Sequence, residues 1–223
     1  MPIQNTGGVT YQKELKCMTK NLIIVFVRNP ELGKVKTRLS KSIGDPAALK
    51  IYKILLSHTE SVLNSISADK VVYYSEEIQQ NDLWSEILYL KRLQKGTDLG
   101  TRIKHAFETA FSDLYEKVVI VGSDLYDLNT THIENALEAL ENHDLVIGPS
   151  LDGGYYLLGM KELHSAVFKN KSWGTDSVLE STLKDLKQQK VKLLEALNDI
   201  DTFEDLKAHP KLLKTIIKDE EIY

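Results

Sequence analysis

Seven short apolar runs, most of them separated by segments with helical features, constrain the fold of this chain more than any other feature. The first, LIIVFVR at 22–28, is apolar without alternation, as in a strand that is covered on both faces. Strands that alternate with helices predict an α/β layered fold with a mainly parallel sheet, whose ligands bind beyond the carboxyl ends of the strands. The other runs lie at 71–75, 87–90, 118–122, 145–149, 155–159 and 191–197.

Several segments between these runs carry helix-start signals. Asp45 has the character of an N-cap with Pro46 at the first helical position, which predicts a helix that reaches about Ile66. Capping residues are also expected at two later helices. The candidates there are Thr131 with Glu134, the neighbouring Asp127 and Asn129, and Thr202 with Asp205.

The composition is that of a globular protein and excludes several classes. With 223 residues and no repeat or linker, we expect one domain over 21–223 after a polar N-terminal extension, residues 1–20. No apolar run approaches the roughly 18 residues of a membrane span. The single cysteine, Cys17, cannot form an intramolecular disulfide, which fits a cytoplasmic protein. The net charge of −4 argues against a general nucleic-acid binder.

Positive charge gathers directly after the first predicted strand, in RNPELGKVKTRLSKSIG. From residue 28 to residue 53, seven cationic side chains stand against two anionic ones, in a chain that is acidic overall. This pattern predicts a phosphate-binding loop in which Gly33 lets the backbone approach and Lys34, Lys36 and Arg38 supply charge. The loop lacks the flanking residues of a Walker A motif, and a solvated basic turn is the alternative.

A second glycine-rich turn, QKGTDLGTRI, precedes a predicted helix. Gly96 and Gly100 flank Asp98, so the backbone can turn tightly and present amides to a flat or anionic ligand. An equally good account is that Asp98 caps the helix that follows.

A third turn, GPSLDGGYYLLG, places Asp152 before Gly153 and Gly154. Paired glycines usually mark a tight hairpin, although they also let a substrate pass close to the backbone. Trp173, in KSWGTDSVLE, either lines an acceptor pocket or packs in the core.

Carboxylates follow two of the predicted strands. VVIVGSDLYDLN places Asp124 just beyond a buried strand, and NDIDTFEDL holds Asp199 and Asp201 after the last strand. Because close carboxylates repel near a dry sheet edge, we expect a cation between them. Mg²⁺ prefers oxygen ligands and keeps several waters, so Asp124 and Asp201 with substrate phosphates would make a sufficient site.

Six segments in this order resemble the bacterial glycosyltransferase-A-like family of the nucleotide-diphospho-sugar transferase superfamily. That family is related to phospholactate and molybdenum-cofactor guanylyltransferases, and the resemblance covers roughly residues 20–208. Two departures from the family pattern are Leu125-Tyr126, where Cys-Pro is common, and Phe203, where proline is usual. The six segments are FVRNPELGKVKTRL, GTDLGTRI, VIVGSDLYDLN, GPSLDGGYYLLG, WGTDSVLE and DIDTFEDL.

This resemblance implies a Rossmann-like three-layer α/β/α sandwich of glycosyltransferase-A type, mainly parallel with one antiparallel strand. It implies a nucleotide over the first half of the sheet, and Mg²⁺ or Mn²⁺ bound by Asp124 and Asp201. The candidate catalytic residues are Asp124, Lys36 and Arg38. The candidate nucleotide-binding residues are Gly33, Lys34, Lys36, Arg38, Gly96, Asp98 and Gly100. The candidate acceptor-binding residues are Asp152, Gly153, Gly154 and Trp173.

Three functions are compatible with these residues. The first is nucleotidyl transfer from an NTP to a phosphorylated small-molecule acceptor, with release of pyrophosphate. The second is glycosyl transfer from an NDP-sugar, and the third is nucleotide binding without catalysis. The cationic loop favours the first, because an NTP has more phosphate to bind, whereas the family naming favours the second. We expect neither a nucleic-acid partner nor a membrane span.

Overall fold

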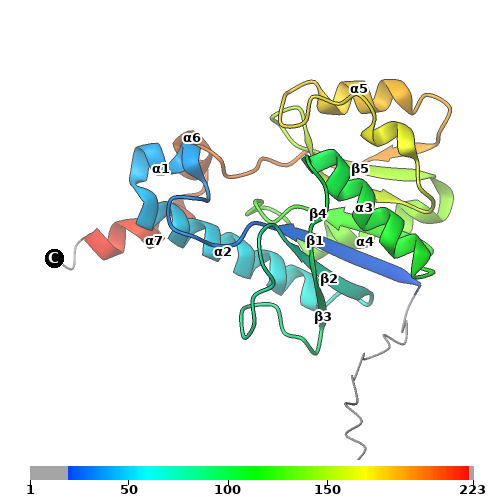
Figure 1. Cartoon of the computed structure of the whole chain (residues 1–223). Coiled ribbons are helices and arrows are strands. Elements are labelled where there is room, and N and C mark those ends of the chain that lie inside the picture. The colour runs from blue at the N-terminus through cyan, green and yellow to red at the C-terminus, as the bar shows by residue number, and fades with distance from the viewer. Residues whose placement is uncertain (1–19, 221–223) are drawn as a thin grey trace, which may run out of the picture.

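A seven-stranded sheet forms the centre of the computed structural model, which describes residues 20–220 (Figure 1). The predicted extension, residues 1–20, therefore lies outside the described residues except for its last position. The strand order is β3-β2-β1-β4-β6-β5-β7. The strands are β1 (Asn21–Val27), β2 (Asp69–Tyr74), β3 (Tyr89–Leu93), β4 (Lys117–Val121), β5 (Leu145–Pro149), β6 (Tyr155–Met160) and β7 (Val191–Leu193).

The pairing of the strands confirms a mainly parallel sheet with one antiparallel strand. β6 runs antiparallel to both β4 and β5, and every other neighbouring pair is parallel. The carboxyl ends of β1 and β4 therefore lie side by side at one edge of the sheet, together with the amino end of β6. Residues that directly follow β1 and β4 are brought together there.

Two predicted strands were displaced or too long. The third run, 87–90, was placed too early, because β3 is an edge strand with polar residues whereas Ile87 is 90% exposed. The last run, 191–197, is a strand only as far as Leu193, and Leu197 then forms an isolated parallel bridge with Ser150. Hydrophobicity alone did not locate these strands, because an edge strand has one solvated side.

Helices cover both faces of the sheet, which makes three layers. Buried side chains of α2 and α4 pack on one face, and those of α3, η1 and α5 pack on the other. No helix in the described range is both long and apolar enough to cross a membrane. The helices are α1 (Thr37–Ile43), α2 (Asp45–Asn64), α3 (Leu99–Ser112), α4 (Thr130–Asn142), η1 (Ser165–Phe168), α5 (Val178–Asp185), α6 (Phe203–Lys207) and α7 (Pro210–Glu220).

The helix caps agree with the sequence at most positions. α2 begins at Asp45 with Pro46 in its first turn, although the N-cap position itself is Gly44. The predicted capping box of Thr131 with Glu134 is wrong, because Asn129 is the N-cap of α4. Asn129 was the alternative, and its side chain satisfies a backbone amide that a threonine inside the helix cannot reach. The Thr202 and Asp205 box at α6 and the Asp98 cap at α3 are confirmed.

A small helical lobe lies beside the carboxyl edge of the sheet. In Figure 1, α1, α6 and α7 gather around the first half of α2, on the left of the view. A separate hydrophobic cluster holds them together, which includes Leu39 of α1, Leu55 of α2, and Leu206 of α6. This lobe positions the segment that begins α1 and the segment that precedes α6 next to the end of β4.

Gly159 in β6 provides a test of the packing between the sheet and α4. A Cβ at this position would lie 2.6 Å from Val146 Cγ1, 3.0 Å from Val119 Cγ2 and 3.3 Å from Leu140 Cδ1. We expect Gly159→Ala to lower the free energy of unfolding by about 1–3 kcal/mol, as overpacking does. Gly122→Ala is the control, because its Cβ would make only ordinary contacts at 3.7 Å or more. Equal urea midpoints for both variants would contradict this account of the core.

Candidate active site

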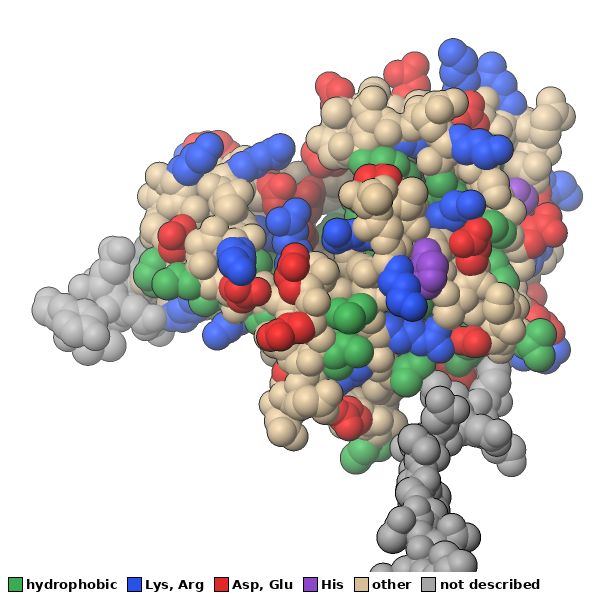
Figure 2. All heavy atoms as spheres, in the orientation of Figure 1, with side chains coloured by type: hydrophobic (Ala, Val, Ile, Leu, Met, Phe, Trp, Pro, Cys, Tyr) green, Lys and Arg blue, Asp and Glu red, His purple; other side chains and the backbone are tan. Residues whose placement is uncertain are grey.

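The candidate site lies where the helical lobe meets the carboxyl edge of the sheet. Asp124 follows β4, Lys36 begins α1, and Asp201 precedes α6. Figure 2 shows a hollow between the lobe and the body of the sheet, bordered by acidic and basic side chains. Three segments that are far apart in the sequence thus supply one charged cluster.

Lys36 lies between the two aspartates. Its Nζ is 3.1 Å from Asp124 Oδ2 and 2.9 Å from Asp201 Oδ1, and its side chain is only 3% exposed. Burial alone would lower the pKa of Lys36, but its ion pairs and hydrogen bonds with Asp124 and Asp201 outweigh burial and raise the pKa. An ammonium group therefore lies between these carboxylates, at the point where the sequence predicts a divalent cation.

The backbone at Lys36 has an uncommon conformation that places its side chain in the cluster. Lys36 is the N-cap of α1 with φ 49° and ψ 43°, in the left-handed region that non-glycine residues rarely adopt. Such a residue costs about 1 kcal/mol or more and persists when its surroundings hold it. The neighbouring Val35 and Leu39 are buried at 2% and 0% exposure, on either side of it. Their packing and the two ion pairs together hold this conformation.

Asp201 is positioned by the cap of α6 and by a direct bond to the sheet. Its backbone amide donates to Asp205 Oδ2 at 3.2 Å, and Thr202 completes the capping box. The amide of Ile200 donates to the carbonyl oxygen of Asp124 at 3.0 Å. Asp124 and Asp201 are therefore held together by the backbone, independently of the ion pairs with Lys36.

The rest of the predicted phosphate loop is exposed. Arg38 is 69% exposed with its Nη1 3.8 Å from Asp201 Oδ2, and Lys34 is 68% exposed and pairs with Glu31 at 2.6 Å. Gly33 has φ 74°, a conformation that favours glycine. Of the three predicted phosphate ligands, the structure thus leaves Arg38 and Lys34 accessible, whereas Lys36 is bound to carboxylates.

The predicted nucleotide turn and the predicted acceptor tryptophan contact each other. A Cβ on Gly100 would lie 2.1 Å from Trp173 Nε1, so the indole lies directly on this glycine. Asp98 caps α3 by accepting from Thr101 N at 2.9 Å, and this hydrogen bond lowers its pKa. Gly96 has φ 145° and its carbonyl oxygen accepts from Arg102 at 3.1 Å. The structural role proposed for Asp98 is therefore present, and the turn packs against the 172–178 segment.

The third glycine turn is the hairpin between β5 and β6. Asp152 Oδ1 accepts from the amide of Gly154 at 2.9 Å. Gly153, with φ 89°, lies against the chain itself, since a Cβ there would be 2.1 Å from the carbonyl oxygen of Asp176. The absence of a side chain at Gly153 thus lets the backbone of residues 174–178 pass close to it, instead of a substrate. Asp152 remains exposed, and its charge acts on Asp199.

Two buried polar residues at this edge were not predicted from the sequence. The Tyr52 hydroxyl accepts a hydrogen bond from the backbone amide of Arg28 at 2.9 Å. It donates one to the carbonyl oxygen of Arg28 at 3.1 Å. Burial, and then the charge of Asp124, raises the pKa of Tyr52, so the hydroxyl stays neutral. Asn29, 3% exposed, donates to Glu77 O at 2.8 Å and ties the end of β1 to the loop after β2. The only sequence signal was the position of Asn29 directly after a predicted strand.

The donor set of the cluster fits a divalent metal with few protein ligands. Asp124 and Asp201 are 42% and 38% exposed, and an oxygen of each lies within about 3 Å of one point, which Lys36 Nζ occupies. Mg²⁺ is commonly bound by one or two carboxylates, with waters and phosphate oxygens completing its coordination. Within residues 20–220, no group of three or more His, Cys, Asp or Glu side chains is arranged to hold a metal. Asp124 and Asp201 are therefore the carboxylates with which the cluster would hold such a metal.

A solved structure of the nucleotide-diphospho-sugar transferase class shares this fold. A crystal structure from Desulfovibrio desulfuricans G20, provisionally described as a nucleotide-diphospho-sugar transferase, matches with a TM-score of 0.78 and 30% identity. The match covers 89% of this chain and 99% of that one. The chain belongs to the family described as "Uncharacterized protein conserved in bacteria (DUF2064)", which matches residues 58–175.

Two curated relatives of this chain are named guanylyltransferases. The 2-phospho-L-lactate guanylyltransferase of Methanocaldococcus jannaschii is 30% identical over 152 residues, which are 66% of this chain and 62% of that protein. The enzyme of the same name from Methanocaldococcus vulcanius is 28% identical over 187 residues, 82% of each chain. The family match at 58–175 includes Asp124, but Lys36 and Asp201 lie outside it.

Asp199, beside the cluster, provides a test of its electrostatics. Its carboxylate accepts from Ser150 Oγ at 2.6 Å. Burial raises the pKa of Asp199, and Ser150 opposes this shift whereas Asp152 and Asp201 add to it. A carboxyl group whose pKa is raised by folding stabilises the protein at low pH and loses that contribution as pH rises through the folded-state pKa.

We therefore expect Asp199→Asn, which stays neutral and still accepts from Ser150, to stabilise the protein at pH 7. The gain should be up to about 1 kcal/mol, given partial exposure, and should shrink as pH falls toward 4. Chemical denaturation over this pH range measures it. Exposed Glu138, replaced by Gln, is the control and should show no such trend. A destabilised Asp199→Asn at pH 7 would show that charge on Asp199 strengthens its bond to Ser150.

Proposed function

We propose that this protein transfers a nucleotidyl group from an NTP to a phosphorylated small-molecule acceptor and releases pyrophosphate. The observation that carries the proposal is the cluster at the carboxyl edge, where Lys36 is buried between Asp124 and Asp201 beside exposed Arg38. Similarity to two 2-phospho-L-lactate guanylyltransferases supports nucleotidyl rather than glycosyl transfer. GTP is accordingly the first nucleotide to test.

In this reaction, a phosphate oxygen of the acceptor attacks the α-phosphorus of the NTP, and the bond from that phosphorus to the bridging oxygen breaks. Both reactants are anionic, so the site must reduce their repulsion. Arg38 is an exposed cation beside the cluster, and the exposed Lys34 belongs to the same loop; both are suited to bind the β- and γ-phosphates. Asp124 and Asp201 would hold Mg²⁺, which neutralises charge on the phosphates when it is bound.

Glycosyl transfer is the second candidate, and one observation favours it. The solved structure with 30% identity and a TM-score of 0.78 is described as a nucleotide-diphospho-sugar transferase. In that reaction the donor is an NDP-sugar, and the cationic residues would bind the departing diphosphate instead of pyrophosphate. Binding and product analysis separate the two functions, because only nucleotidyl transfer releases pyrophosphate.

A thermal-shift panel of the four NTPs and their matching NDP-sugars, each with and without Mg²⁺, tests the nucleotide class. A ligand at 100 times its dissociation constant adds about 2.7 kcal/mol, which raises the Tm of a chain of this size by roughly 5–10 °C. We expect the largest shift from an NTP with Mg²⁺, and pyrophosphate release when 2-phospho-L-lactate or another phosphorylated acid is added. A larger shift from an NDP-sugar, with sugar transfer and no pyrophosphate, would establish the glycosyltransferase.

The metal is tested separately, because Lys36 occupies the point between the two carboxylates. We expect Lys36→Met to bind Mn²⁺ more tightly than the parent without nucleotide, by about tenfold, since no ammonium competes for the same oxygens. Electron paramagnetic resonance of free Mn²⁺ measures this affinity. Lys34→Met, from the same loop, is the control and should leave it unchanged.

The two aspartates give the complementary result. Asp201→Asn in the Lys36→Met background should remove the tight Mn²⁺ binding, and circular dichroism should confirm that both variants are folded. Unchanged Mn²⁺ affinity in Lys36→Met would mean that these carboxylates do not bind the metal. Lys36 would then be the permanent counterion of the cluster.

A further inference from the structure

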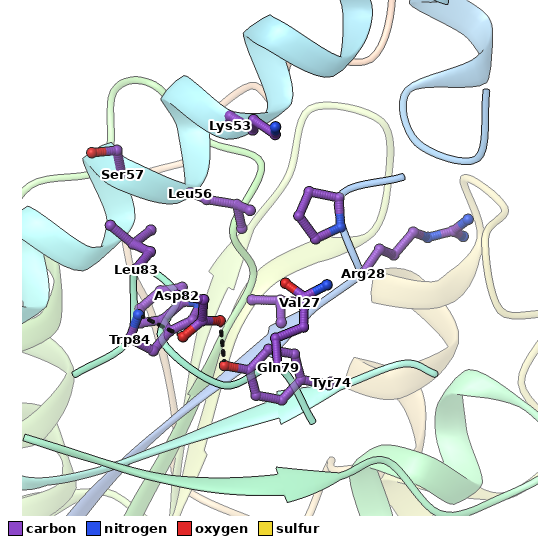
Figure 3. Close-up of a pocket in the computed structure, with 11 residues that line it drawn as sticks. Val27, Arg28, Lys53, Leu56, Ser57, Tyr74, Gln79, Asp82, Leu83 and Trp84 are labelled. Carbon is purple, nitrogen blue, oxygen red and sulfur yellow. Dashed lines mark hydrogen bonds between the residues drawn. The ribbon is translucent and has the colours of Figure 1, made fainter. Parts of the chain in front are cut away.

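A cavity on the α2 side of the sheet is separate from the charged cluster. It has a volume of about 330 Å³, and neither Lys36 nor the two aspartates line it. Small-molecule sites are mostly apolar and enclose roughly 300–1,000 Å³. Figure 3 shows the cavity between α2, the end of β1 and the loop that carries Asp82 to Trp84.

The walls of the cavity are apolar and firmly built. Leu56 and Trp84 are 5% and 2% exposed, and both line it. Asp82 accepts from Tyr74 Oη at 2.7 Å, from Trp84 N at 3.2 Å and from Lys91 Nζ at 2.7 Å. The one carboxylate in the lining is therefore neutralised and hydrogen-bonded to the wall. These contacts hold one wall of the cavity in place.

The mouth of the cavity is positively charged. Lys53 and Ser57 of α2 line both the cavity and an adjoining groove of about 400 Å³, which Leu49 and Lys50 also line. No carboxylate lines this groove, and Lys53 forms no ion pair with any residue in the described part of the chain. Arg28 also lines the cavity, although in Figure 3 its side chain extends away from Trp84, whereas Lys53 lines both the cavity and the groove and is the cation at their junction.

We propose that the cavity and groove bind an amphipathic anion. Its apolar chain or ring would fill the cavity over Trp84, and its carboxylate, phosphate or sulfonate would pair with Lys53 at the mouth. A mostly apolar cavity with Lys53 where it joins the groove suits this class of ligand, because the apolar part is desolvated while the charge stays near water. This site is independent of the proposed nucleotidyl transfer.

Binding is measured on the full chain with Trp173→Phe, which leaves Trp84 as the single tryptophan of the sequence. The probe is 8-anilinonaphthalene-1-sulfonate, an aromatic sulfonate that accepts energy from tryptophan. We expect saturable quenching of Trp84 and displacement of the probe by decanoate, with decan-1-ol displacing it several-fold less well. GTP with Mg²⁺, added to the parent chain and followed by the fluorescence of the probe itself, should not displace it, because the two sites are separate.

Two variants test where the probe binds and whether Lys53 pairs with the charge of the ligand. Ser57→Phe places a ring at the junction of cavity and groove and should weaken probe binding roughly tenfold or more. Lys53→Gln should weaken decanoate about two- to fivefold, as expected for an exposed ion pair, and leave decan-1-ol unchanged. Lys187→Gln, an exposed lysine near α5, is the control. Unfolding midpoints of all variants must match the parent, since the probe also binds partly unfolded chains.

Three outcomes would overturn the proposal. The first is quenching that does not saturate, and the second is binding that Ser57→Phe and Lys53→Gln both leave unchanged. The third is displacement by GTP with Mg²⁺, which would make the cavity part of the nucleotide site. A failure of nucleotidyl transfer would leave the probe titration unaffected, so the two proposals are tested separately.

Discussion

The site depends on one interaction, the burial of the Lys36 ammonium between Asp124 and Asp201. An unpaired ammonium at 3% exposure would be unfavourable, and two adjacent carboxylates would repel each other. The three groups therefore stabilise one another only when α1, the end of β4 and the segment before α6 are all in place. The same contacts fasten the helical lobe to the sheet, together with the Ile200 to Asp124 hydrogen bond.

Under the proposed function, the cluster would have two chemical states. With Lys36 between the carboxylates, the charges are compensated inside the protein. A divalent cation would need the same oxygens, and Lys36 would then be released toward an anionic substrate. The exposed fractions of the Asp124 and Asp201 side chains, 42% and 38%, leave these carboxylates reachable from solvent. In the proposed reaction, the ammonium of Lys36 and the metal would therefore compete for the same two carboxylates, which also fasten the helical lobe to the sheet.

Much of the fold followed from local sequence patterns, because apolar β-branched runs and capping residues act over a few positions. These patterns located β1, β4, β5 and β6 closely, and the cap of α6. They misplaced β3, whose edge position allows Lys91 and Arg92 inside a strand while Ile87 is left exposed. Residue types alone could not show which of Asn129 and Thr131 caps α4, because that depends on where the backbone turns.

The sequence by itself determined the class of fold, the charge of the loop after β1 and the positions of Asp124 and Asp201 after apolar segments. Only the tertiary structure decided that Lys36 turns inward while Lys34 and Arg38 face solvent, because this depends on its left-handed backbone and on packing at α1. It also decided that Gly100 supports Trp173 and that a cavity forms over Trp84. Charge and hydrophobicity are local properties of a chain, whereas the partner of a buried ion is set by contacts between distant segments.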